Sequence, residues 1–296
     1  MVGVMAYESS APASLIRATR ARDHIVDRLI AERAPRLAGS PAWPALRPLL
    51  YAILDYGKAR RMADAIAPLG GRAALDFISD LLTVRVETSG LERVPERGRL
   101  VVICNHPTGI ADGVAVYDAL KARRPDILFY ANSDALRVAP RFDEILIPVE
   151  WVEAKRTRER TRVTLAMTRQ AMEDERALVI FPSGKLARQV RPGHAVDPPW
   201  AGSAFSVARK YDAPILPVHV AGPWPTLFHL FDGVSGELRD VTLFHELLNK
   251  QGKPFKITVG AQVPPSAMPA DPAAAALAMK AYVENTLPAD PMRPFA

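Results

Sequence analysis

Residues 100–113 of the 296-residue chain read Leu-Val-Val-Ile-Cys-Asn-His-Pro-Thr-Gly-Ile-Ala-Asp-Gly. The first five residues form a continuous apolar run, which is typical of a strand buried on both faces of a parallel sheet. The polar loop that follows contains proline and glycine, and helical spacing begins at Asp112. A strand, a loop and a helix in this order predict one unit of an α/β fold. Ligands of such folds bind at the carboxyl ends of the strands, so His106 is well placed for chemistry.

The same alternation continues through the rest of the chain after Thr83. Short β-rich runs are separated by segments with helical spacing. The predicted strands are Val84–Glu87, Leu100–Cys104, Ile127–Tyr130, Ile145–Val149, Leu178–Phe181, Ile215–Val220 and Lys256–Gly260. The predicted helices are Asp112–Ala122, Arg158–Asp174, Gly202–Tyr211 and Ala273–Asn285. We therefore expect an α/β fold with a mostly parallel sheet of about seven strands flanked by helices.

The part of the chain before Thr83 has a helical pattern and predicts a separate N-terminal helical layer. Arg17–Arg33 is a charged amphipathic stretch, and apolar residues recur at helical spacing along Leu46–Ile66 beside several cationic side chains. The Leu46–Ile66 helix either lies on a membrane surface or packs on its own domain, and its pattern fits both. We expect a helical region at residues 1–80, an α/β domain at 81–265, and a C-terminal helix and tail at 266–296.

The composition limits the classes of function. Hydrophobic residues at 49% and charged residues at 24% indicate a chain with a substantial core. A single cysteine, Cys104, excludes an intramolecular disulfide framework and a multi-cysteine zinc site. The formal charge of +6 and the pI near 9.5 favour nucleic acid or an anionic lipid surface as partner. We expect no secretory signal and no spanning helix, because no apolar stretch approaches the roughly 18 residues that a span requires.

His106 and Asp112 are the first candidates for catalysis. Pro107 restricts the backbone at His106 and Gly109 permits a tight turn, so the loop can bring Asp112 near the imidazole. A carboxylate there would orient the ring and stabilise its protonated form, which is the arrangement of a general base. A lone histidine near an aspartate is more often structural than catalytic, so the pair needs support from elsewhere in the chain.

Two further blocks supply that support, Ile180–Lys185 and Ala213–Val218, each at a predicted strand. Together with the His/Asp segment, their order and separation resemble the glycerolipid acyltransferase superfamily, whose best-known member is lysophosphatidic acid acyltransferase. The resemblance covers roughly Leu82–Val263. The distal run Glu246–Lys250 is similar to the hemolysin-like or lysophospholipid acyltransferase branch.

The resemblance implies an O-acyltransferase in which His106 is the catalytic base and Asp112 its partner. His106 would take the proton of an acceptor hydroxyl, and the oxygen would attack the thioester of acyl-ACP (acyl carrier protein) or acyl-CoA. It implies no metal, and no cofactor beyond this co-substrate. The implied partners are a lysolipid-type acceptor, the carrier protein or CoA thioester and an anionic membrane surface, with no nucleic acid. The implied location is cytoplasmic, peripheral on the inner face of the cell membrane.

This sequence departs from the family pattern in three places. Five residues, not four, separate His106 from Asp112, so the motif is HX5D. The common Phe-Pro-Glu-Gly-Thr-Arg block reads Phe-Pro-Ser-Gly-Lys-Leu at residues 181–186, and the strand end Ile147–Glu150 lacks an arginine often found there. Because two usual contacts to the polar end of the acceptor are missing, we expect an acceptor other than lysophosphatidic acid, such as a lysophospholipid or an acylated amino acid.

Substrate binding is expected from the second block and from the basic residues 155–162. The latter form two rows along a helix, which suit a phosphate or an acidic carrier protein, or form a solvated face. The predicted substrate-binding residues are Asn105, Ser183, Gly184, Lys185, Arg188, Arg156 and Arg158.

Several other chemistries fail on spacing. His245-Glu246 begins like a zinc-protease helix, but Asn249 stands where the second histidine is needed, and Gly184-Lys185 lacks the other elements of a phosphate-binding loop. Cys104 reads as a core residue, although a Cys/His hydrolase is formally open. Two rival functions remain: a thioesterase or hydrolase that uses the same His/Asp pair with water, and a basic nucleic-acid-binding module.

Overall fold

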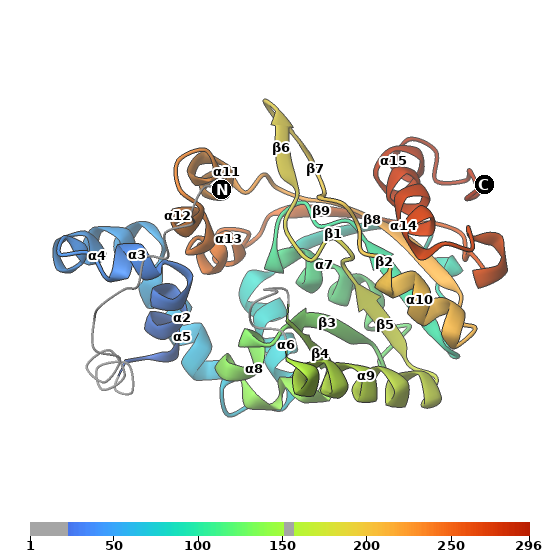
Figure 1. Ribbon diagram of the computed structural model, residues 1–296, viewed down its shortest axis with the longest axis horizontal. Coiled ribbons are helices and arrows are strands. Elements are labelled where there is room, and N and C mark those ends of the chain that lie inside the picture. The colour runs from blue at the N-terminus through green and yellow to red at the C-terminus, as the bar shows by residue number, and fades with distance from the viewer. Residues whose placement is uncertain (1–22, 151–156) are drawn as a thin grey trace, which may run out of the picture.

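A seven-stranded sheet forms the centre of the computed structural model, which describes residues 23–150 and 157–296 (Figure 1). In spatial order the strands are β1 (Arg85–Ser89), β9 (Pro254–Val259), β8 (Ile215–Ala221), β2 (Leu100–Cys104), β5 (Ala177–Ile180), β3 (Leu128–Asn132) and β4 (Leu146–Val149). Every neighbouring pair is parallel except β8 and β9. The predicted mostly parallel α/β sheet is confirmed, and each predicted strand overlaps an observed one.

Helices cover both faces of the sheet. The helices before the first strand are α2 (Ile25–Arg33), α3 (Pro35–Ala38), α4 (Trp43–Ile53), α5 (Tyr56–Ile66) and α6 (Gly71–Leu82). Those within the sheet region are α7 (Ile110–Leu120), α8 (Asp134–Val138), α9 (Arg158–Glu173) and α10 (Ser203–Lys210). The remaining helices are α11 (Thr226–Asp232), α12 (Gly236–Asp240), α13 (Leu243–Leu248), α14 (Pro272–Ala281), a π-helical turn (Tyr282–Thr286) and α15 (Leu287–Ala289). The core on one side of the sheet includes residues of α2, α5, α6, α7 and α13, and the core on the other side includes residues of α9, α10 and α14.

Strand β2 joins the two cores because its side chains alternate between the faces of the sheet. Val101 and Ile103 belong to the core under α10, whereas Leu100, Val102 and Cys104 belong to the core under α7. All five are fully buried, as expected for a central parallel strand. Burial raises the pKa of the Cys104 thiol well above its usual value. Cys104 is therefore a small core residue, and the structure gives no support to a cysteine nucleophile.

The prediction of one continuous helix over Leu46–Ile66 is wrong. The chain breaks at Asp55, whose φ of 53° lies in the left-handed region and ends α4 before α5 begins. Helix α5 buries one face in the core, while α4 buries only Leu50 and leaves Leu46, Leu49 and Ile53 exposed. The corner at Asp55 thus turns α5 into the core and leaves the apolar face of α4 exposed.

Helices α11–α13 and strands β6 (Arg188–Arg191) and β7 (His194–Val196) have no counterpart among the predicted elements. Helices α11–α13 form a small cluster beside the N-terminal helices, and β6 and β7 form a hairpin that projects from the body (Figure 1). Residues 17–22 of the Arg17–Arg33 stretch lie outside the described residues, and the rest of that stretch contains α2. Across residues 23–150 and 157–296, no helix has both the length and the apolar character that crossing a bilayer requires.

Candidate active site

The imidazole of His106 lies at the carboxyl end of β2, beside the first turn of α7. Its Nδ1 is 2.9 Å from Oδ2 of Asp112, so the loop does bring the two residues together. The Asp112 side chain is completely buried and also accepts hydrogen bonds from Thr108 Oγ1 at 2.5 Å and from the N–H groups of Thr108 and Gly109. Its place in the first turn of a helix further favours a negative charge. Asp112 therefore fixes both the loop and the ring.

Gly109 makes the turn between His106 and Asp112. This glycine has φ 108° and ψ −147°, a backbone conformation that is essentially restricted to glycine. It turns the chain so that α7 starts at Ile110 and Asp112 points back at the loop. The altered spacing thus leaves the His–Asp contact intact.

The open side of His106 faces an apolar cavity of about 320 Å³. The ring lies on Phe181, with ring centroids 4.6 Å apart. If Nδ1–H donates to Asp112, Nε2 is the basic nitrogen that is left for a substrate proton. The other apolar residues that line the cavity are Leu75, Ile78, Ile110, Val114, Phe129, Tyr130, Ala131, Ala135, Phe142, Leu146, Leu186 and Leu243. This apolar lining is suited to binding a hydrocarbon chain, and His106 lies in the same wall.

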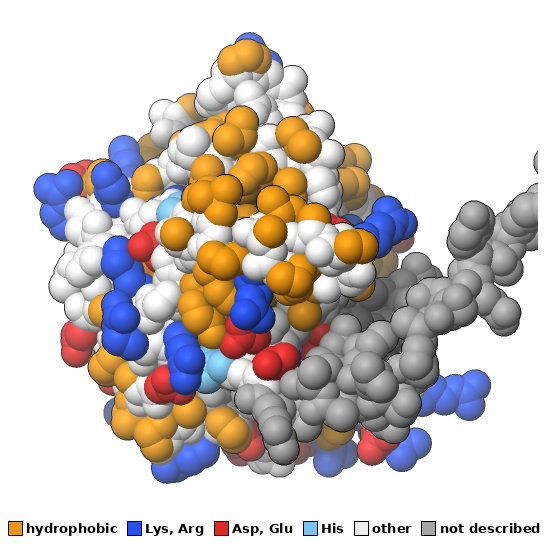
Figure 2. Space-filling view, turned by 90° about the vertical axis from the view of Figure 1, so that its left-hand side faces the viewer, with side chains coloured by type: hydrophobic (Ala, Val, Ile, Leu, Met, Phe, Trp, Pro, Cys, Tyr) orange, Lys and Arg blue, Asp and Glu red, His pale blue; other side chains and the backbone are white. Residues whose placement is uncertain are grey.

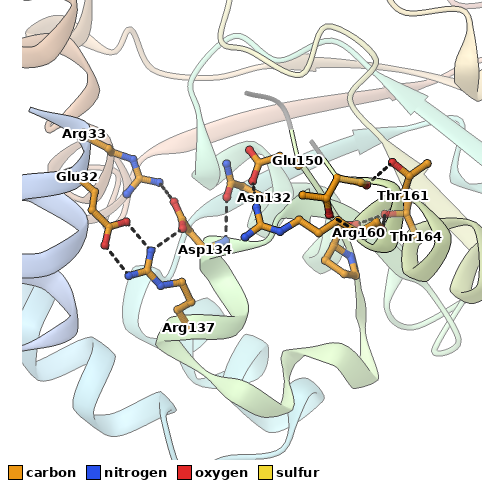
Figure 3. A network of polar contacts seen from close by, with 11 residues as sticks. Glu32, Arg33, Asn132, Asp134, Arg137, Glu150, Arg160, Thr161 and Thr164 are labelled. Atoms are coloured by element: carbon orange, nitrogen blue, oxygen red, sulfur yellow. Dashed lines mark hydrogen bonds and ion pairs between the residues drawn. The ribbon is translucent and has the colours of Figure 1, made fainter. Parts of the chain in front are cut away.

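Charged residues close one edge of this cavity. Arg33 lines it and pairs with Asp134 at 2.9 Å, joining α2 to α8, and Arg137 of α8 pairs with Glu32 at 2.7 Å (Figure 3). Asn132, also on the lining, accepts the N–H of Asp134. The network continues in the same view to the ion pair of Arg160 and Glu150. The N-terminal helices are therefore attached to the site by specific contacts and form part of its wall.

The predicted substrate-binding residues lie in different places. Gly184 lines the cavity, Ser183 donates its hydroxyl to the carbonyl of Lys185, and Lys185 is exposed. Arg188 is already paired with Asp232 at 2.5 Å and lies over the ring of Phe228. Ser183, Gly184 and Lys185 thus lie near His106. The charge of Arg188, in contrast, is neutralised by Asp232.

Two further residues predicted to bind substrate, Asn105 and Arg158, do not line the His106 cavity, and a third, Arg156, lies outside the described residues. The Asn105 side chain is buried and exchanges two hydrogen bonds with the main chain of Val220, so it clamps β2 to β8 and does not line the His106 cavity. Arg158 lines a separate groove of about 730 Å³ along α9, which shares no residue with the His106 cavity. Arg156 and Lys155 lie outside the described residues.

The sequence reasoning missed Asp197, whose carboxylate receives the main-chain N–H of His106 at 3.1 Å and Trp200 Nε1 at 2.9 Å. Burial raises the pKa of Asp197 to about 6, against the lowering effect of these bonds and of His106. Asp197 is 91 residues distant in sequence and belongs to no family block, so no sequence signal linked it to the loop. Among the described residues, no group of three His, Cys, Asp or Glu side chains could hold a metal ion.

Comparison with known proteins adds to this geometry. Residues 85–221 match the family described as Acyltransferase. The chain is 24% identical over 202 residues to a lyso-glycine lipid O-acyltransferase of Phocaeicola vulgatus, covering 65% of this chain and 70% of that protein. It is 22% identical over 202 residues to a lyso-glycine lipid O-acyltransferase of Bacteroides thetaiotaomicron, covering 65% and 72%. The crystal structure of the 1-acyl-sn-glycerophosphate acyltransferase PlsC of Thermotoga maritima aligns with a TM-score of 0.49 and 14% identity, covering 91% and 98% of the two chains.

Replacing Gly109 by alanine should disturb the site, and replacing Gly113 should not destabilise the fold. A Cβ at Gly109 would meet Leu186 Cδ2 at 3.1 Å and would strain the backbone, so we expect a loss of about 1–3 kcal/mol in the free energy of unfolding. Gly113, inside α7, has open space there, and Gly113→Ala should add about 0.5–1 kcal/mol. Urea unfolding of both variants measures the difference, and equal stabilities would contradict the account of Gly109.

Proposed function

Because the chain belongs to the glycerolipid acyltransferase superfamily, we propose that it moves a fatty acyl chain from an acyl thioester to the hydroxyl of a lysolipid, with His106 as general base. The observation that carries this proposal is the contact of His106 with a buried carboxylate at the wall of an apolar cavity. A cavity of this kind binds a hydrocarbon chain and keeps water from the reacting carbonyl.

The proposed reaction uses the two ring nitrogens of His106 in different ways. Nε2 takes the proton of the acceptor hydroxyl while the oxygen bonds to the thioester carbonyl carbon, which gives a tetrahedral oxyanion. Collapse of this intermediate breaks the carbon–sulfur bond, and the imidazolium returns the proton to the leaving thiolate. Asp112 accepts the Nδ1–H throughout and stabilises the imidazolium. The mechanism is the same for a donor on acyl carrier protein or on CoA.

His106→Ala should abolish acyl transfer, and Asp112→Asn should lower kcat about 100-fold or more, because general base catalysis and orientation of the ring are lost. Turnover is measured with a radiolabelled acyl thioester, with and without added lysolipid. His194→Ala, at an exposed position in the hairpin, is the matched control and should keep full activity.

The result without lysolipid separates the two catalytic rivals. Product that forms only when lysolipid is present supports transfer, whereas equal thioester cleavage without it would identify a hydrolase that uses the same pair. Near-normal turnover by His106→Ala, with an unchanged thermal midpoint, would refute the mechanism.

The acceptor is proposed to be a lyso-amino-acid lipid rather than lysophosphatidic acid. A phosphate monoester needs several directed cations. Arg188 is committed to Asp232, and Leu186, at the position where arginine is common in the family, is buried and lines the cavity. Of the cations in this block, Lys185 alone extends into solvent near the site. The relatives described as lyso-glycine lipid O-acyltransferases support an acceptor of this class.

In competition at equal concentrations, a lyso-glycine lipid should be acylated about 10-fold faster than lysophosphatidic acid, which is the effect of one missing charged hydrogen bond. Mass spectrometry of the mixed products measures this ratio. Arg188→Gln is the informative variant, because a paired arginine that does not touch the acceptor should leave the ratio unchanged. A clear preference for lysophosphatidic acid that is lost in Lys185→Ala would contradict the proposal.

Membrane association is proposed to involve α4. Its exposed Leu46, Leu49 and Ile53 belong to the end of the molecule that faces the viewer in Figure 2, where hydrophobic side chains gather with Lys and Arg beside them. Cationic side chains of α5, including Lys58 and Arg60, are also exposed. An apolar helix face with basic neighbours is suited to the surface of an anionic bilayer.

Leu49→Asp should reduce binding to anionic vesicles about 10-fold, which corresponds to the loss of one buried leucine side chain. Leu277→Asp is the matched control, since Leu277 is 72% exposed, compared with 63% for Leu49, but lies on α14 at the opposite end of the molecule (Figure 1). Vesicle sedimentation measures the binding of both variants.

Point substitutions are needed here because α2, α5 and α6 supply core residues, so deletion of residues 1–80 would disturb the fold as well as the contact with the membrane. Equal loss in the two variants would exclude α4 as the specific contact.

A further inference from the structure

The main chain of His106 is held on both sides by the two ends of the β6–β7 hairpin. The N–H of Ala187, just before β6, donates to the carbonyl of His106 at 2.9 Å. The N–H of His106 donates to both carboxylate oxygens of Asp197, just after β7, at 3.1 Å each. Asp112 fixes the ring of the histidine, whereas these two contacts fix the peptide that carries the ring.

The Asp197 carboxylate is itself held in place from the far side of the sheet. Trp200 Nε1 donates to its Oδ2 at 2.9 Å, and the N–H of Asp197 donates to Glu284 Oε1 at 2.8 Å. Glu284 lies in the π-helical turn after α14 and pairs with Lys280. With only 5% of its surface exposed, Asp197 is one of the few buried carboxylates in the described part of the chain. It connects the catalytic loop to the C-terminal helices.

We infer that Asp197 is a positioning residue for acyl transfer, which acts through the His106 main chain to keep Nε2 at the reacting hydroxyl. The inference rests on the proposed function of His106. A carboxylate that receives an N–H is a stronger acceptor than a neutral oxygen, so the peptide is held firmly although the loop around it is irregular. A displacement of the base by about 1 Å is enough to lower a rate about 100-fold.

The two donors that share the Asp197 carboxylate provide a specific test. An asparagine at this position has one acceptor oxygen and one NH2 group, whereas His106 and Trp200 both present N–H donors. In Asp197→Asn the amide oxygen at the Oδ2 position can still accept Trp200 Nε1, but the His106 N–H, which is 3.1 Å from both positions, then also faces the NH2 group at the Oδ1 position. Trp200→Phe removes the second donor but leaves both carboxylate oxygens of Asp197 to the His106 N–H.

The experiment compares Asp197→Asn with Trp200→Phe in the full chain. We expect kcat to fall about 100-fold in Asp197→Asn and to stay within about 3-fold in Trp200→Phe, which keeps both oxygens for the His106 N–H. KM values for both substrates should stay within about twofold. If Asp197 only supported packing, Trp200→Phe, which removes part of the same buried cluster, would lower kcat at least as much as Asp197→Asn.

A proton NMR measurement provides a second readout that does not depend on turnover. The Nδ1–H of His106 should give a downfield signal in the wild-type protein and in Trp200→Phe, and a shifted or broadened one in Asp197→Asn. A kcat within 3-fold of wild type for Asp197→Asn, or an equal loss of kcat in Trp200→Phe, would overturn the inference. His106→Ala tests the proposed function separately: loss of turnover there with normal Asp197→Asn activity would refute the positioning role alone.

Discussion

The buried carboxylate of Asp112 is the interaction on which the rest of the site depends. Its four donors come from the loop that precedes it, and it belongs to the first turn of α7, so it ties the end of β2 to the helix. An unpaired charge at a fully buried position would be unfavourable by several kcal/mol. The donors and the helix N-terminus compensate for this. They also fix the ring of His106 against Phe181, with one side open to the cavity.

The cavity is assembled from parts of the chain that are far apart in sequence. Helices α2, α6, α7, α8 and α13 and strands β3 and β4 all contribute residues to its wall. The ion pair of Arg33 with Asp134 and that of Glu32 with Arg137 connect α2 to α8 at its edge. The N-terminal helices are thus part of the site. Helix α4 turns an apolar face outward, because the left-handed corner at Asp55 separates it from α5.

Local pairing decides which of the many cationic side chains are available to a ligand. The chain has 38 Lys and Arg residues and a formal charge of +6, which alone would suggest a strongly basic site. Asp232 instead pairs with both Arg188 and Arg239, and Asp134 pairs with Arg33. The pairing of Arg188 and the apolar side chain of Leu186 leave an environment near His106 that is poor in directed cations. This supports an acceptor whose polar end carries less charge than a phosphate monoester.

The sequence by itself determined the seven strands, most of the long helices and the location of His106, because short-range periodicity and the loop after a buried strand are local properties. It also carried the family blocks, whose order is visible along the chain. Only the tertiary structure decided the contacts of Asn105, Arg188 and Asp197, since their partners Val220, Asp232 and His106 lie 115, 44 and 91 residues away. The corner at Asp55 was likewise hidden, because helical spacing continues across a break that tertiary packing favours. Residue type and spacing report what a segment can form, whereas the partner of each buried polar group is chosen when distant segments meet.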